Sequence, residues 1–157
     1  MDLDQQIQVL IEYAPKDGVT PKVVEAIAPA LKRIAQKLRH PQYYILQTLE
    51  QSWILTTISN RANPGLEKNV IYAFSTLKDV AAGSQQSLRD SQILALPVPA
   101  IHILFQMMAM ETVDSVVFFE TPGNVDTGTE IKRTELQTLI QSYLQANFSS
   151  NIPPNIA

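Results

Sequence analysis

The segment LPVPAIHILFQMMAMETVDSVVFFETPGNVDTGTEIKRTELQTLI, from Leu96 to Ile140, decides the fold class. Its two prolines lead into an apolar run, which predicts a helix that starts near Pro99. The stretch from Ser115 to Glu120 has a continuous apolar centre, as in a central strand covered on both faces. A glycine-containing loop, Thr121 to Thr129, and a closing helix around Leu136 follow. This order predicts an α+β or α/β domain.

The residues before this segment change from helical to strand-like periodicity. Apolar residues at helical spacing predict a first helix near Leu3 to Ile11 and a second over Thr20 to Leu38, with Thr20 as its N-cap. Aromatic and β-branched runs then predict three strands that form an antiparallel meander over about residues 43–74. A short helix, Thr76 to Ala82, and a short strand, Gln92 to Leu96, come next. We therefore expect a small mixed sheet with later strands, flanked by helices and preceded by an N-terminal helical pair.

The length of 157 residues fits a single domain that buries its own core. We assign residues 1–147 to it, with the helical pair at 1–40 and the sheet-bearing core at 41–147. Residues 148–157, which include two consecutive prolines, are expected to form a flexible tail. The helical pair is expected to pack on its own sheet, and its exchange with a second chain is the alternative.

Composition excludes several classes of protein. The chain has no cysteine, so disulfides, thiolate nucleophiles and cysteine-bound metals are excluded. A net charge of -3 argues against nonspecific nucleic-acid binding, which depends on neutralising phosphates. The acidic N-terminus lacks a secretory pattern, and the longest apolar run, Ala100 to Met110, is too short to cross a bilayer. We expect a soluble cytoplasmic protein that binds neither nucleic acid nor a membrane.

The residue types needed for catalysis are not grouped in the sequence. His40 and His102 are the two histidines, one at a helix end and one within an apolar helix, where structural hydrogen bonds are the commoner situation. Gly123 and Gly128 follow a strand, but no phosphate-binding glycine motif is present and turns explain them. We predict no catalytic residue, no metal site and no cofactor.

Five acidic residues nevertheless stand near the ends of one helix and one strand: Glu111, Asp114, Glu120, Asp126 and Glu130. Such positions often hold ligands in open α/β sheets, and paired carboxylates can bind a cation or divide acid and base roles. The spacing is not that of a calcium loop, so we interpret the set as a solvated surface. A metal-dependent hydrolase that uses this cluster over residues 111–130, with His102, is an alternative. It requires several of these side chains within about 4 to 6 Å of one another.

Several strings in the second half of the chain resemble the N-terminal domain of the SseB-like family. They cover about residues 43–140. In chain order they are a β-hairpin, a strand that leads into a short helix (Ile71 to Val80), Leu96-Pro97-Val98 at the opening of a helix, the strand Val116 to Phe119, the Gly123 loop and the helix start Ile131 to Leu136. The resemblance implies this fold and an accessory or interaction role. It implies no catalytic residues.

We therefore predict a noncatalytic accessory module that binds a protein partner, with a second copy of the chain as one candidate. The expected binding surfaces are the meander, with Trp53 and Tyr72, and the loop after the strand, with Glu120, Gly123 and Asp126.

A small-molecule sensor is a further alternative to the interaction module. It requires an apolar pocket lined by Phe105, Met108, Phe118 and Phe119. The methionines of this helix are otherwise expected to fill the core, because flexible thioethers fit irregular gaps.

Overall fold

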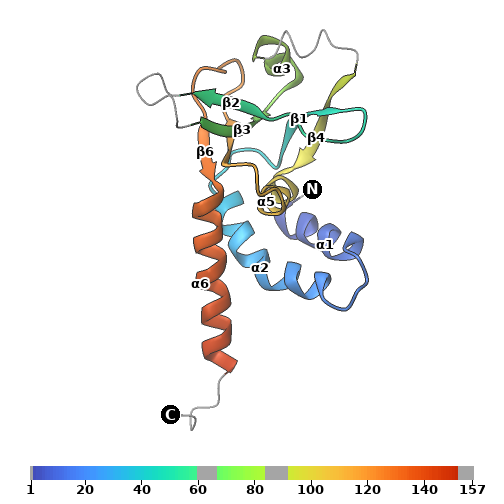
Figure 1. The fold of residues 1–157 in the computed structure, drawn as a ribbon, viewed down its shortest axis with the longest axis vertical. Helices are drawn as coiled ribbons and strands as arrows, with labels where there is room; N and C mark the ends of the chain where they lie inside the picture. Colours follow the sequence, from blue (N-terminus) through green and yellow to red (C-terminus); the bar gives the residue numbers. More distant parts are fainter. Residues whose placement is uncertain (1, 60–66, 84–91, 152–157) are drawn as a thin grey trace.

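The computed structural model describes residues 2–59, 67–83 and 92–151, and the predicted combination of helices with a mixed sheet is confirmed (Figure 1). The helices are α1 (Leu3–Tyr13), α2 (Thr20–Ala35), α3 (Leu77–Gly83), α5 (Ala100–Ala109) and α6 (Arg133–Asn151). The strands are β1 (Gln42–Thr48), β2 (Thr56–Ser59), β3 (Glu67–Phe74), β4 (Ile93–Pro99), β5 (Ser115–Phe119) and β6 (Thr129–Lys132). Within the described ranges, no helix has both the length and the apolar character needed to cross a membrane.

The strands form one sheet in the order β4-β1-β3-β5-β6, with β2 beside β3. β3 and β5 are parallel, and the other pairs are antiparallel. The first three strands are antiparallel as predicted, but β1 and β2 both pair with the edge of β3 that faces away from β5. The chain leaves β3 after Ile45 and rejoins it at Thr56. Between them it makes a hairpin that turns at Gln51 (φ 68°) and brings Trp53 opposite Gln47.

The edge strand β4 continues to Pro99, three residues beyond the predicted end of this strand at Leu96. The helix begins at Ala100, close to its predicted start near Pro99, and the Ala100 N–H donates to the Pro41 carbonyl at 2.9 Å. Hydrogen-bonded positions alternate along an antiparallel pair, so Pro97 and Pro99 occupy positions whose N–H would point away from β1. Proline is tolerated there because no strand of the described residues pairs with β4 on that side.

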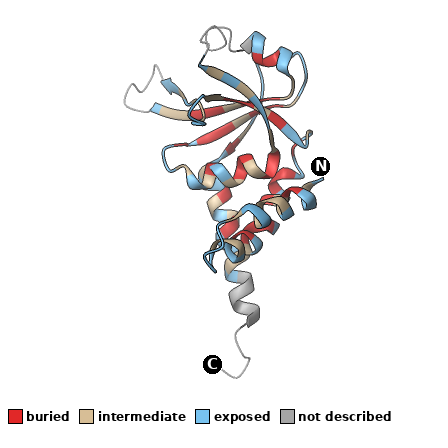
Figure 2. Cartoon of the chain, turned by 90° about the vertical axis from the view of Figure 1, so that its right-hand side faces the viewer, coloured by how far each residue is buried: buried red, intermediate tan, exposed pale blue. Residues whose placement is uncertain are grey.

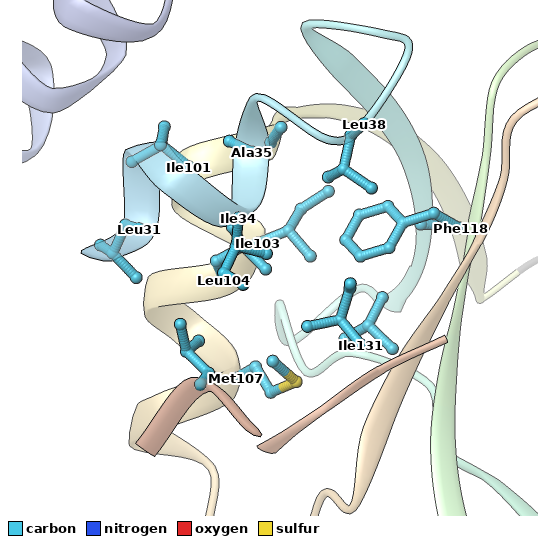
Figure 3. Packing of buried hydrophobic residues seen from close by; sticks show 14 of the residues in the cluster. Leu31, Ile34, Ala35, Leu38, Ile101, Ile103, Leu104, Met107, Phe118 and Ile131 are labelled. Carbon is cyan, nitrogen blue, oxygen red and sulfur yellow. The ribbon is translucent and has the colours of Figure 1, made fainter. Parts of the chain in front are cut away.

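The main core lies between the sheet and the helices below it. Buried residues gather along the central strands and on the helix surfaces that face them (Figure 2). Leu31 of α2, Ile101 and Met107 of α5, and Phe118 of β5 meet in this core (Figure 3). α5 is apolar almost all round because it packs against both the sheet side and the pair α1 and α2. The N-terminal pair therefore shares one core with the sheet of the same chain.

Two local predictions differ from the structure. Thr20 does not cap α2. The Asp17 carboxylate accepts the N–H groups of Val19 and Thr20 instead, at 2.9 and 2.7 Å. Asp17 can do so because it stands about one turn before the helix. The loop ends at about Thr129 as predicted, but Thr129–Lys132 then forms a strand that was not predicted, β6, against β5. Asn63-Pro64-Gly65 is a sequence typical of a turn, and the polar stretch from Ser84 to Ser91 is typical of a loop. Both segments lie outside the described residues, as do residues 152–157 of the predicted tail.

Candidate functional site

Polar side chains gather where β5 ends, at the edge of the sheet that also receives the carboxyl end of β3. Glu120 follows β5, and its Oε1 accepts hydrogen bonds from the Tyr43 hydroxyl at 2.5 Å and from the Arg39 backbone N–H at 3.0 Å. Burial, reinforced by the bond to Glu120, raises the pKa of Tyr43 above its usual range, so this hydroxyl stays a neutral donor. Glu120 thus joins the segment after α2 to the end of β5.

His40 is the second anchor at this junction. Its Nε2 lies 2.6 Å from the backbone carbonyl oxygen of Glu120. A carbonyl can only accept, so Nε2 carries the hydrogen. The ring also stands edge-on to Tyr43, with 5.6 Å between ring centres. His40 therefore helps to hold the segment after α2 against the end of β5.

A pocket of about 430 Å³ lies beside His40 and is lined by Gln6, His40, Pro41, Gln42, Ser75 and Pro99. The Ser75 hydroxyl donates to Asp79 Oδ2 at 3.2 Å. Its single hydrogen is thereby committed to a carboxylate rather than to an imidazole. Serine and histidine line the same pocket without the hydrogen bond that nucleophilic catalysis needs.

The loop between β5 and β6 is fixed to α3 by one buried carboxylate. Asp79 is only 3% exposed, and its Oδ1 accepts the Gly123 N–H at 2.9 Å. Gly123 has φ +86°, a left-handed conformation that glycine adopts without strain. Farther along, the Asn124 side-chain oxygen accepts the N–H groups of Asp126 and Thr127 at 3.0 and 3.2 Å. The predicted site residues Gly123 and Asp126 therefore belong to an ordered loop.

Gly128 brings this loop back onto β5. A Cβ at this position would lie 2.7 Å from Val117 Cγ1, 3.0 Å from the Phe118 carbonyl oxygen and 3.2 Å from Phe119 Cδ1. Only glycine permits so close an approach. Beside it is a pocket of about 180 Å³ lined by Arg39, Glu120, Thr121, Thr127, Gly128 and Thr129.

An aromatic hollow lies on the sheet face opposite the main core. Tyr72 of β3 stacks on Phe119 of β5 with 5.5 Å between ring centres, and Phe74 stacks on Phe119 at 5.2 Å. With Val125 of the loop, these three rings line a pocket of about 190 Å³. Tyr72 and Val125 are half-buried, so the hollow opens to solvent.

The five predicted partner-binding residues do not form one surface. Tyr72 meets the predicted loop through Val125. Trp53 packs instead against the main core, on the other side of the sheet. Glu120, Gly123 and Asp126 share the loop region.

The acidic set is dispersed rather than gathered in a cleft. Asp114 and Glu120 flank β5 at opposite ends, and Asp114 Oδ2 accepts the Asn69 N–H at 2.8 Å. Glu130 pairs with Lys68 and accepts the Ser115 hydroxyl at 2.7 Å, and these contacts lower the pKa of Glu130. Among the residues that the structure describes, no three acidic or histidine side chains are placed to hold a metal ion.

His102 and the predicted sensor pocket also have structural explanations. The His102 Nε2 lies 3.3 Å from the Gln6 carbonyl, and burial lowers the pKa of His102. Phe118 belongs to the main core, whereas Phe119 belongs to the cluster on the opposite face. Phe105, Met108, Phe118 and Phe119 consequently do not line one pocket.

Arg39, Tyr43 and Asp79 belong to the site but were not among its predicted residues. Tyr43 reads as an ordinary strand residue, and its partner Glu120 is 77 positions away in the chain. Asp79 is one acidic residue in a short helix, 44 positions from Gly123. No local pattern signals such long-range contacts.

Comparison of the chain with protein-family models, with curated proteins and with solved structures finds no match. The resemblance to the SseB-like family rests on the sequence strings quoted above, and the function must be inferred from the geometry of the site itself.

Proposed function

We propose that this chain is a noncatalytic accessory module that binds a protein partner through the sheet face opposite the main core. The aromatic hollow of Tyr72, Phe74, Phe119 and Val125 carries this proposal. Half-open aromatic pockets of this kind accept apolar side chains of a partner, and buried aromatic contacts often dominate interface energies. The occupant that fits is an apolar or aromatic side chain presented by another protein.

The loop after β5 supports the same surface. Val125 closes one side of the hollow, and the loop that carries it is held by Asp79 through Gly123. A wall that is already ordered loses little conformational entropy when a partner binds. The resemblance to the SseB-like family agrees with such an accessory role.

The candidate acid–base groups are engaged in structural hydrogen bonds. His40 donates to a backbone carbonyl, and Glu120 accepts from Tyr43 and Arg39. Ser75 is bonded to Asp79. These bonds favour a binding module over the metal-dependent hydrolase.

The test is affinity capture from native lysate with identification by mass spectrometry, followed by calorimetric titration of the captured partner. Tyr72→Ala is expected to weaken that partner about tenfold or more, as loss of a central aromatic contact does. Tyr13→Ala is the matched control, since Tyr13 is 83% exposed and belongs to α1. Equal affinity of both variants for the partner would show that the hollow is not the binding surface. Trp53→Ala then tests the opposite side of the sheet.

A further inference from the structure

The pocket at the end of β5 is lined by the hydroxyls of Thr121, Thr127 and Thr129. Thr121 Oγ1 accepts from Arg39 Nη1 at 3.4 Å, and Thr127 Oγ1 accepts from Asn124 Nδ2 at 3.0 Å. Each hydroxyl therefore still has its own hydrogen to donate, as does Thr129. Within the described parts of the chain, none of these three hydroxyl hydrogens has an acceptor.

Arg39 supplies the charge of the pocket. Its guanidinium has five N–H groups, of which the structure engages one with Thr121 at a long distance. The side chain is exposed, and its backbone N–H, rather than its guanidinium, makes the bond to Glu120. The guanidinium can thus bind a ligand while the main chain keeps the junction intact.

Among the residues that the structure describes, Glu120 is the one carboxylate that lines this pocket. Its Oε1 is already satisfied by the Tyr43 hydroxyl and the Arg39 N–H, which leaves Oε2 as the acceptor of the carboxyl group. Three hydroxyls and a guanidinium can donate hydrogen bonds into this pocket. A ligand that only accepts hydrogen bonds can use all of these donors at once, so the lining favours an oxyanion.

We propose that this pocket binds a small oxyanion, a carboxylate or a phosphate group, between Arg39 and the hydroxyls of Thr121, Thr127 and Thr129. Its volume of about 180 Å³ is room for roughly six water molecules at their share of liquid volume. An acetate or phosphate ion fits within it, and the open side leaves space for whatever carries the group. This site is separate from the aromatic hollow, which is lined by other residues.

The test is a titration of the full chain with inorganic phosphate and, separately, with acetate, followed by backbone amide NMR shifts at constant ionic strength. Saturable shifts are expected at residues 121 and 127–129 with at least one ion. Binding of phosphate alone identifies a phosphate site, and binding of acetate alone a carboxylate site. Absence of a saturable shift with both ions at concentrations on the order of 10 mM overturns the proposal.

Two substitutions in the pocket separate an anion site from a cation site. Arg39→Gln is expected to weaken the bound ion about tenfold or more, because it removes a charge-assisted hydrogen bond. Glu120→Gln keeps an oxygen for Tyr43 and removes the repulsive charge, so it is expected to strengthen binding. The opposite pair of effects would indicate a cation site and refute the proposal.

Arg33→Gln is the matched control for net charge. Arg33 is exposed on α2 and does not line the pocket. Its substitution is expected to change the affinity less than about twofold, as for a screened charge outside the site. A loss equal to that of Arg39→Gln would mean that the ion responds to overall charge and not to this pocket.

Discussion

Replacing Tyr43 by phenylalanine removes one hydroxyl from the junction of β1 with the end of β5 and leaves the ring in place. That hydroxyl donates to the Glu120 carboxylate at 2.5 Å and accepts the backbone N–H of His40 at 3.3 Å. The ring keeps its edge-on contact with Phe118, at 4.9 Å between centres, so core packing is retained. A hydrogen bond to a charged group contributes about 1.5–3 kcal/mol, and we expect Tyr43→Phe to lower the free energy of unfolding by that amount.

Urea denaturation measures this loss directly. With a slope of about 1–3 kcal/mol per molar urea, the midpoint is expected to fall by about 1 M without a change of slope. Tyr13→Phe makes the same chemical change at a side chain that is 83% exposed, and it is expected to stay within about 0.5 kcal/mol of the wild type. If Tyr43→Phe also changes stability by less than about 0.5 kcal/mol, the Tyr43–Glu120 bond does not stabilise the junction.

Two further predictions concern stability. Gly128→Ala places a Cβ 2.7 Å from Val117 Cγ1 and 3.0 Å from a backbone oxygen, so we expect the free energy of unfolding to fall by about 1–3 kcal/mol in thermal denaturation. An unchanged melting temperature would contradict this close approach. Burial lowers the pKa of His102, so the unfolded chain takes up its proton first and the free energy of unfolding falls as pH decreases through about 6.5. In urea titrations between about pH 7.5 and pH 5, His102→Gln should reduce that fall, and identical slopes would refute the assignment.

The elements with strong periodicity could be predicted from the sequence. α2 follows from its apolar face, and β5 from a continuous apolar run that needs cover on both faces. β6 escaped prediction because Thr129–Lys132 is short and buries only Ile131. β4 extends to Pro99 instead of ending at Leu96 as predicted, because its prolines resemble a helix start and only the sheet order shows that they stand on an edge strand.

The candidate site could be predicted only as single residues. Glu120 and Gly123 were identified from their position after a strand, and Tyr72 from its aromatic character. Their partners come from distant parts of the chain: the Glu120 carboxylate meets Arg39 across 81 positions and Tyr43 across 77. Trp53 and Tyr72 lie on opposite faces of the sheet because of its register, and a shift of one residue would move a side chain to the other face.

The prolines of β4 also bear on how this sheet ends. At Ile93, Ala95, Pro97 and Pro99 the backbone nitrogen points away from β1, and the two prolines have no N–H there to donate. A strand of another molecule that paired with this edge would find backbone N–H donors only at Ile93 and Ala95. Edge strands whose N–H groups are all available are the usual template for aggregation. Pro97 and Pro99 therefore protect the chain against unwanted growth of its sheet, while β1 keeps its full pairing on the inner side.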